Sequence, residues 1–182
     1  MPKLSLRHII LHRRIGLFWT GAIVGLVAPW LVTAPVSWSF AESDPQVCTV
    51  NSIYDGDTMR VTCSGQKMKI RLYCIDAPEI AQRPWGQESR DYLRQIAGKR
   101  VRVVPRTTDR YGRTVGEVWS LDDEGEQGTL NMAMILAGHA AVYRKYCGDP
   151  AYDDAERFAA GGRTGIWSRE GQHQAPWVYR KR

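Results

Sequence analysis

An alternation of apolar and polar residues predicts a strand that begins at Met68. Lys69, Arg71 and Tyr73 interrupt the apolar positions at every second place, as in a strand with one face in a core. The first face is therefore predicted to be buried, and the second to form a basic and aromatic surface. Such a surface suits a phosphate backbone, although an ordinary solvated face gives the same pattern. Four further strands are predicted at 47–54, 58–63, 100–106 and 114–121.

Three other segments have the spacing and the end signals of helices. The segment 85–97 carries its apolar residues on one stripe. The segment 130–137 is apolar on nearly every side, which predicts a short buried helix with Thr129 as its N-cap. A third helix is predicted to start at Asp149-Pro150, because an acid at the cap and a proline in the first turn favour a helix start.

The first 41 residues have the three parts of an export signal. Residues 1–14 are basic, 15–36 are almost wholly apolar, and Ser39 and Ala41 place small side chains where a signal peptidase cuts. We predict Sec-dependent export, cleavage after Ala41, and a secreted or periplasmic protein. The alternative is an uncleaved inner-membrane anchor with the domain outside, because the apolar segment is long enough to span roughly 30 Å of hydrocarbon.

The remaining chain is predicted to be one domain with short ends. We expect a linker at 42–46, a single domain at 47–168 and a C-terminal tail at 169–182. The net charge of the whole chain is +6, but four of its 25 basic residues and none of its 19 acids lie in the first 41 residues. The rest carries 21 basic and 19 acidic residues, a net charge of +2. An interaction with nucleic acid must therefore rest on local clusters of charge.

Four cysteines follow the predicted cleavage site: Cys48, Cys63, Cys74 and Cys147. An even number in an exported protein predicts disulfides, and four cysteines allow three pairings. If Asp55-Gly56 is a two-residue turn, Cys48 lies opposite Cys63 as a hydrogen-bonded pair with Cα atoms about 5.5 Å apart. Cys74 then pairs with Cys147. A bulge at the turn would shift this register, so the other pairings stay open.

Charged residues near this turn point to phosphate chemistry. The sequence Asp55-Gly56-Asp57-Thr58 between two strands predicts a tight turn, because glycine accepts positive φ. Two arginines, Arg71 and Arg113, supply guanidinium forks that match phosphate oxygens. Three acids able to converge supply hard oxygen ligands of the kind that calcium or magnesium takes: Asp57, Asp76 and Glu79.

These residues fall in four blocks that resemble the signature of the staphylococcal nuclease (thermonuclease) family. The blocks are an Asp-Gly-Asp-Thr turn at 55–58, an Arg-Leu pair at 71–72, an Asp-x-Pro-Glu loop at 76–79 and a Tyr-Gly-Arg at 111–113. Each block is weak alone, whereas the four in this order and spacing are specific. The resemblance covers about 47–168 and implies an α+β fold, a five-stranded OB-fold β-barrel with about three α-helices.

The resemblance also implies an activity, the calcium-dependent hydrolysis of DNA and RNA between phosphorus and the 5′ oxygen, which leaves 3′-phosphates. The implied calcium ligands are Asp57, Asp76 and the main-chain carbonyl of Ala77, where the family usually has threonine. Glu79 would act on the attacking water, as a general base or by orienting it. Both arginines would hold the scissile phosphate and neutralise the charge that builds on it: Arg71 and Arg113.

Further residues are candidates for contacts beside the metal site. Asp55 is either structural or supports the metal site, because aspartate before glycine is also what a turn prefers. Arg110 and Tyr111 flank the last block, where the family uses its tyrosine on the 3′ phosphate; packing of the loop is the alternative for Tyr111. Two more tyrosines are candidates for base stacking: Tyr143 and Tyr146.

An OB-fold module that binds nucleic acid but has lost catalysis is the alternative function. A surface that only binds a polyanion has no need of three acids, so the acids together with both arginines favour the enzyme. The segment 79–85 is shorter than the corresponding loop of the best-known family member, which affects the substrate side and not the metal site. No partner protein is indicated and we expect a monomer. The tail either docks through Trp177 or is loose.

Overall fold

The computed structural model describes residues 45–122 and 128–181. The predicted export signal at 1–41 and the first part of the linker lie outside these residues, so cleavage and anchoring both stay predictions. Within the described part of the chain, no helix has the length and apolar character needed to cross a membrane.

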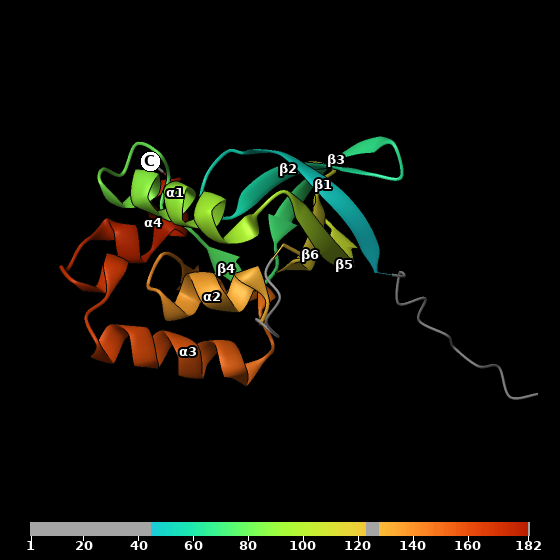
Figure 1. Ribbon diagram of the computed structural model, residues 1–182. Coiled ribbons are helices and arrows are strands. Elements are labelled where there is room, and N and C mark those ends of the chain that lie inside the picture. The colour runs from blue at the N-terminus through green and yellow to red at the C-terminus, as the bar shows by residue number, and fades with distance from the viewer. Residues whose placement is uncertain (1–44, 123–127, 182) are drawn as a thin grey trace, which may run out of the picture. The chain divides into compact units, whose positions relative to one another are not determined.

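Five strands close into a barrel (Figure 1). They are β1 (Gln46–Ile53), β2 (Thr58–Cys63), β3 (Gln66–Leu72), β5 (Arg100–Thr108) and β6 (Thr114–Ser120). The order around the barrel is β1-β2-β3-β6-β5, and β5 pairs back onto β1. Neighbouring strands are antiparallel except for β3 and β6, which are parallel. The predicted α+β class and five-stranded OB-fold barrel are confirmed.

The hairpin of β1 and β2 has a register that the sequence predicted only in part. Cys48 lies opposite Cys63 and forms a disulfide with it, as predicted. Their Cα atoms are 4.3 Å apart, which is the spacing of a non-hydrogen-bonded pair and not of the predicted hydrogen-bonded pair. The predicted two-residue turn is also wrong, because the strands already end at the pair Ile53 and Met59. A bulge within β1 then restores the register of the cysteines.

In the described ranges, four α-helices accompany the barrel: α1 (Trp85–Ala97), α2 (Leu130–Leu136), α3 (Pro150–Gly161) and α4 (Pro176–Tyr179). Figure 1 shows α2 between α1 and α3. Both predicted N-caps are present, since Thr129 Oγ1 accepts a hydrogen bond from the Met132 N–H and Asp149 Oδ1 accepts one from the Ala151 N–H. The described residues also form three 3-10 helices: Arg144–Tyr146, Gly165–Trp167 and Gln172–Gln174.

Two short strands outside the barrel were not predicted. β4 (Ile75–Asp76) pairs with β7 (Ala141–Val142), and a disulfide joins Cys74 to Cys147 next to them. A two-residue strand is too short for an alternation to be visible in the sequence. Asp76 was predicted to lie in a loop and instead ends a strand that a ladder and a disulfide hold in place.

The alternation that begins at Met68 predicts the core correctly and the opposite face only in part. Ile70 and Leu72 are buried, as predicted, and contribute to a core that fills the barrel and extends under α1 and α2. Lys69 is exposed, but Arg71 on the same face of β3 is buried, with 9% of its surface exposed. Burial of an arginine requires partners for its charge, and these partners form the candidate site.

Candidate active site

The loop between β1 and β2 carries Asp55 and Asp57. It is closed by the Tyr54 N–H, which donates to the Thr58 carbonyl at 3.0 Å. The Asp57 N–H donates to Asp55 Oδ1 at 3.0 Å, which is the hydrogen bond of an Asx turn. Asp55 therefore shapes the loop that presents Asp57.

Gly56 is required by the space around it and not by its backbone angle. Its φ is not positive, contrary to the expectation for a tight turn. A Cβ at this position would lie 2.6 Å from the Cβ atoms of both Ala77 and Ser89. The loop thus packs directly on the segment after β4 and on α1, and this close approach brings Asp57 towards Asp76.

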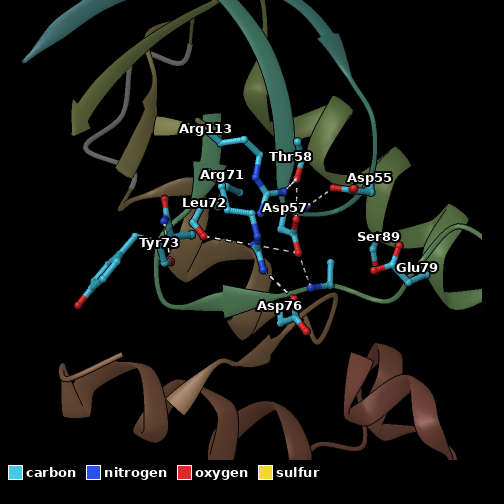
Figure 2. Close-up of polar contacts among 12 residues, drawn as sticks. Asp55, Asp57, Thr58, Arg71, Leu72, Tyr73, Asp76, Glu79, Ser89 and Arg113 are labelled. Atoms are coloured by element: carbon cyan, nitrogen blue, oxygen red, sulfur yellow. Dashed lines mark hydrogen bonds and ion pairs between the residues drawn. The ribbon is translucent and has the colours of Figure 1, made fainter. Parts of the chain in front are cut away.

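Arg71 joins the two acids proposed as metal ligands, and Figure 2 shows its guanidinium between their carboxylates. Its Nη1 lies 2.9 Å from Asp57 Oδ2, and its Nη2 lies 2.7 Å from Asp76 Oδ1. The strand register explains the first contact, because Arg71 on β3 lies opposite Thr58, the neighbour of Asp57. Both acids are deeply buried, with 5% of Asp57 and none of Asp76 exposed.

Asp57 is also fixed by hydrogen bonds from three other chain positions. Its Oδ2 accepts from the Ala77 N–H at 2.8 Å, and its Oδ1 accepts from Thr58 Oγ1 at 2.9 Å. Its carbonyl accepts from the Leu72 N–H at 2.8 Å. The first of these bonds holds the backbone of Ala77, whose carbonyl is the proposed third ligand, beside the Asp57 carboxylate.

Burial and mutual repulsion disfavour the ionised forms of two carboxyls in this cluster. Burial first, and then the charge of Asp57, raise the pKa of Asp76 to about 6 although Arg71 opposes the change. The same two causes raise the pKa of Asp55 to about 7. Ionised carboxylates that are buried near one another are stabilised by a further cation. The electrostatics of the cluster therefore fit a cation site.

Glu79 lies on the loop between β4 and α1, and 35% of its side chain is exposed. Its N–H donates to Gln82 Oε1 at 2.9 Å, and its carbonyl accepts from the Gln82 N–H at 2.8 Å. The first turn of α1 approaches so closely that a Cβ on Gly86 would lie 2.0 Å from the Glu79 carbonyl oxygen. The backbone is thus fixed while the carboxylate reaches solvent, as a group that acts on water requires.

Arg113 comes from the turn between β5 and β6. Asp109 holds it, because Asp109 Oδ2 accepts from the Arg113 Nε–H at 2.7 Å and Oδ1 accepts from the Arg113 N–H at 3.0 Å. Arg113 Nη1 lies 3.5 Å from Thr58 Oγ1, so the guanidinium points to the Asp57 loop (Figure 2). Asp109 was not predicted from the sequence. Its signal there was an acid four residues before the arginine with a glycine between them, and Gly112 is left-handed in the structure.

Comparisons with known proteins agree with this geometry. A family model described as staphylococcal nuclease homologue matches residues 69–169, more than half of the chain. The chain belongs to the staphylococcal nuclease family. An uncharacterized endonuclease of Escherichia coli O157:H7 is 36% identical over 149 residues, which cover 79% of this chain and 94% of that protein. A micrococcal nuclease of Shigella flexneri is 37% identical over 137 residues, which cover 71% of this chain and 77% of that protein.

The residues of this nuclease fit a calcium site with few protein ligands. Within the described ranges, no group of three or more acidic, histidine or cysteine side chains is placed to hold a metal, so the three predicted acids do not form such a cluster. Asp57 and Asp76 remain, with the backbone of Ala77 beside them. Buried carboxylate and carbonyl oxygens are hard donors that suit calcium, and a small donor set leaves positions for water and phosphate.

The candidate residues for substrate contact differ in how much of their side chains is exposed. Tyr111 is 68% exposed, and the Arg110 guanidinium lies 4.7 Å from its ring centre. Tyr143 stacks on Trp177 with ring centres 5.6 Å apart, which shows that the tail docks on the domain. Tyr146 meets Tyr143 edge-on and stays 58% exposed. Tyr146 and Tyr111 thus keep more free surface for a base than Tyr143 does.

The structure brings one further residue into the site that the sequence did not predict. Arg180, directly after α4, donates from Nη2 to both carboxylate oxygens of Asp76 at 2.7 Å. Its Nη1 donates to Glu79 Oε1 at 2.7 Å. The only signal in the sequence was the basic end Arg180-Lys181-Arg182, which is also typical of a solvated tail.

Proposed function

We propose that this family member is an exported, calcium-dependent nuclease that hydrolyses phosphodiester bonds of DNA and RNA. We further propose that it cleaves between phosphorus and the 5′ oxygen, so that its products carry 3′-phosphates. The main support is the buried Arg71 between Asp57 and Asp76, with two more charged groups at the rim of the same site, Glu79 and Arg113. Export rests on the signal predicted at 1–41, which lies outside the described residues.

Each group of the site has a chemical task in this proposal. Asp57, Asp76 and the Ala77 carbonyl would hold calcium, which supplies positive charge to the phosphate and lowers the pKa of water when bound. Glu79 would orient the attacking water and take its proton. Both arginines would donate to the phosphate oxygens on which charge develops during attack: Arg71 and Arg113.

A basic patch continues from the site along β2 and β3 and supports a nucleic-acid substrate. Arg60 and Lys69 lie directly opposite each other on these strands, and both are exposed. Like charges in this position destabilise a sheet. Both cations lie over the ring of Tyr54, at 5.3 and 5.2 Å from its centre. We call Tyr54, Arg60 and Lys69 the Tyr54 patch, and we propose that it binds the backbone beside the scissile phosphate.

Digestion of single-stranded DNA with calcium and with chelator tests the activity. We expect hydrolysis with calcium only, and losses of about two to three orders of magnitude in rate for Glu79→Gln and Arg113→Ala. Arg157→Ala removes an exposed arginine that pairs with Asp154 on α3 and serves as the control. Product ends that a polymerase extends only after phosphatase treatment would support 3′-phosphates. DNA binding without hydrolysis in every form would favour the inactive module instead.

The mass of the protein recovered from cells tests the proposed export. A chain that begins at Glu42 supports cleavage after Ala41 and a secreted or periplasmic enzyme. A full-length chain that stays with the inner membrane supports the anchored alternative.

A further inference from the structure

The C-terminal tail, which begins at Arg169, is attached to the domain at three residues. His173 is 8% exposed, stacks on Trp85 with ring centres 4.4 Å apart, and donates from Nε2 to the Arg169 carbonyl at 2.8 Å. Pro176, the first residue of α4, is buried. Trp177 stacks on Tyr143. The position of α4, and of the arginine that follows it, is therefore set by packing on α1 and on the segment after β7.

This packing directs Arg180 onto two carboxylates that the proposed function needs. Asp76 is fully buried, and both of its oxygens accept from Arg180 Nη2, while the other arm of the guanidinium holds Glu79. One planar fork thus spans a proposed calcium ligand and the proposed water-orienting group. The two acids lie 104 and 101 residues before Arg180 in the chain, so the contact depends on the docked tail.

Arg71 contacts Asp76 through Oδ1 alone, whereas Arg180 contacts both oxygens, so a calcium ion on this carboxylate would meet the positive charge of Arg180 at either oxygen. We propose that Arg180 competes with calcium, so that the tail is an autoinhibitory strap which calcium must displace from Asp76 and Glu79. This inference rests on the proposed calcium site. It gives the strap a defined role, because the fraction of molecules with Arg180 displaced sets the apparent calcium affinity.

Calorimetric titration of the protein with calcium chloride, without nucleic acid, tests the strap. Arg180→Gln is expected to lower the calcium Kd about tenfold, the result for a strap that is closed in about nine molecules of ten. Lys181→Gln is the matched control, because it removes the same charge one residue further on and should change the Kd less than twofold. Trp177→Ala loosens α4 without touching either acid and should also lower the Kd.

The outcomes separate the strap from the proposed function. If the unsubstituted protein and Arg180→Gln bind calcium with the same Kd, Arg180 does not compete with calcium. The proposal of an autoinhibitory strap is then wrong, while the proposed calcium site stands. If Arg180→Gln lowers the rate of hydrolysis at saturating calcium without changing the Kd, Arg180 serves the substrate and the strap is again wrong. If no variant binds calcium at millimolar concentration, both the strap and the calcium site are wrong.

Discussion

Arg71 and Arg113 have the same proposed task in different surroundings. The Arg71 side chain is 10% exposed and lies on β3 of the barrel between two buried acids. The Arg113 side chain is 23% exposed and lies on a turn, where an acid of the same turn, Asp109, holds it. The first arginine belongs to the internal charge balance of the fold, and the second is positioned by a local turn. Substitution should therefore affect folding and chemistry together at Arg71, and chemistry alone at Arg113.

Replacing each arginine with alanine tests this comparison with the largest expected effects. Arg71→Ala leaves Asp57 and Asp76 without their shared partner, and breaking a buried ion pair lowers the free energy of unfolding by about 3–5 kcal/mol. Arg113→Ala should lower it by only about 1 kcal/mol, because its ion pair with Asp109 lies within one turn and is partly exposed. Both variants should lose about two to three orders of magnitude in the rate of hydrolysis. Urea unfolding without calcium and single-turnover hydrolysis with calcium measure the two effects.

The lysine variants show whether charge alone is sufficient at each position. Arg71→Lys and Arg113→Lys keep the charge and lose the planar fork, so we expect neither to recover the full rate. An equal loss of unfolding free energy in Arg71→Ala and Arg113→Ala would contradict the distinction between the barrel and the turn.

Gly56→Ala perturbs the barrel side of the site without removing a charge. The new methyl group would clash with Ala77 and Ser89, and overpacking of this kind costs about 1–3 kcal/mol of unfolding free energy. Moving the loop also moves Asp57 away from Asp76, so we expect weaker calcium binding in calorimetry. Gly161→Ala is the control, because no atom lies within 4 Å of its added Cβ and α3 should become slightly more stable. An unchanged calcium Kd in Gly56→Ala would show that the close packing is not needed.

The difference between local and long-range contacts also explains what the sequence could predict. Periodicity and end signals place the barrel strands and the helices at 85–97 and 150–161, because those patterns are local. The burial of Arg71 and the pairing of β4 with β7 depend on segments that meet only in the fold. Motif order located the charged residues, but it contained no information about Arg180, which reaches the site through stacking of the tail.

Asp109, which holds Arg113 in its turn, should make the stability of the protein depend on pH. Burial pushes the pKa of this carboxyl up, but hydrogen bonds from Arg113 and Tyr111 outweigh burial and hold the pKa below its ordinary value of 3.8. Because the folded pKa is lowered, the contribution to stability is present above pH 3.8 and is lost as the pH falls through the folded value. Asp109→Asn should thus be less stable than the unsubstituted protein near neutral pH, and the difference should shrink and vanish as the pH falls through the folded pKa of Asp109.

Activity of the same variant measures how well the turn positions Arg113. We expect Asp109→Asn to lower the rate of hydrolysis about tenfold, less than removal of the arginine itself, because the guanidinium remains but loses its charged partner. Thermal unfolding between pH 3 and pH 7 and hydrolysis at neutral pH are the two measurements. A rate equal to that of Arg113→Ala would mean that Asp109 is indispensable for placing the guanidinium, and an unchanged rate would mean that the turn positions it without Asp109.

Unlike Arg71, the two cations of the Tyr54 patch are exposed. Arg60→Gln with Lys69→Gln removes two cations that face each other, so the sheet should not lose stability. Binding of single-stranded DNA in chelator should weaken, and the slope of log K against log salt should become shallower by about 1.4, because each phosphate contact on a single strand contributes about 0.7. Arg102→Gln with Arg157→Gln removes two exposed cations outside the patch, one on β5 and one on α3, and is the matched control. An equal change of slope in the control would show that the effect is one of net charge and not of this patch.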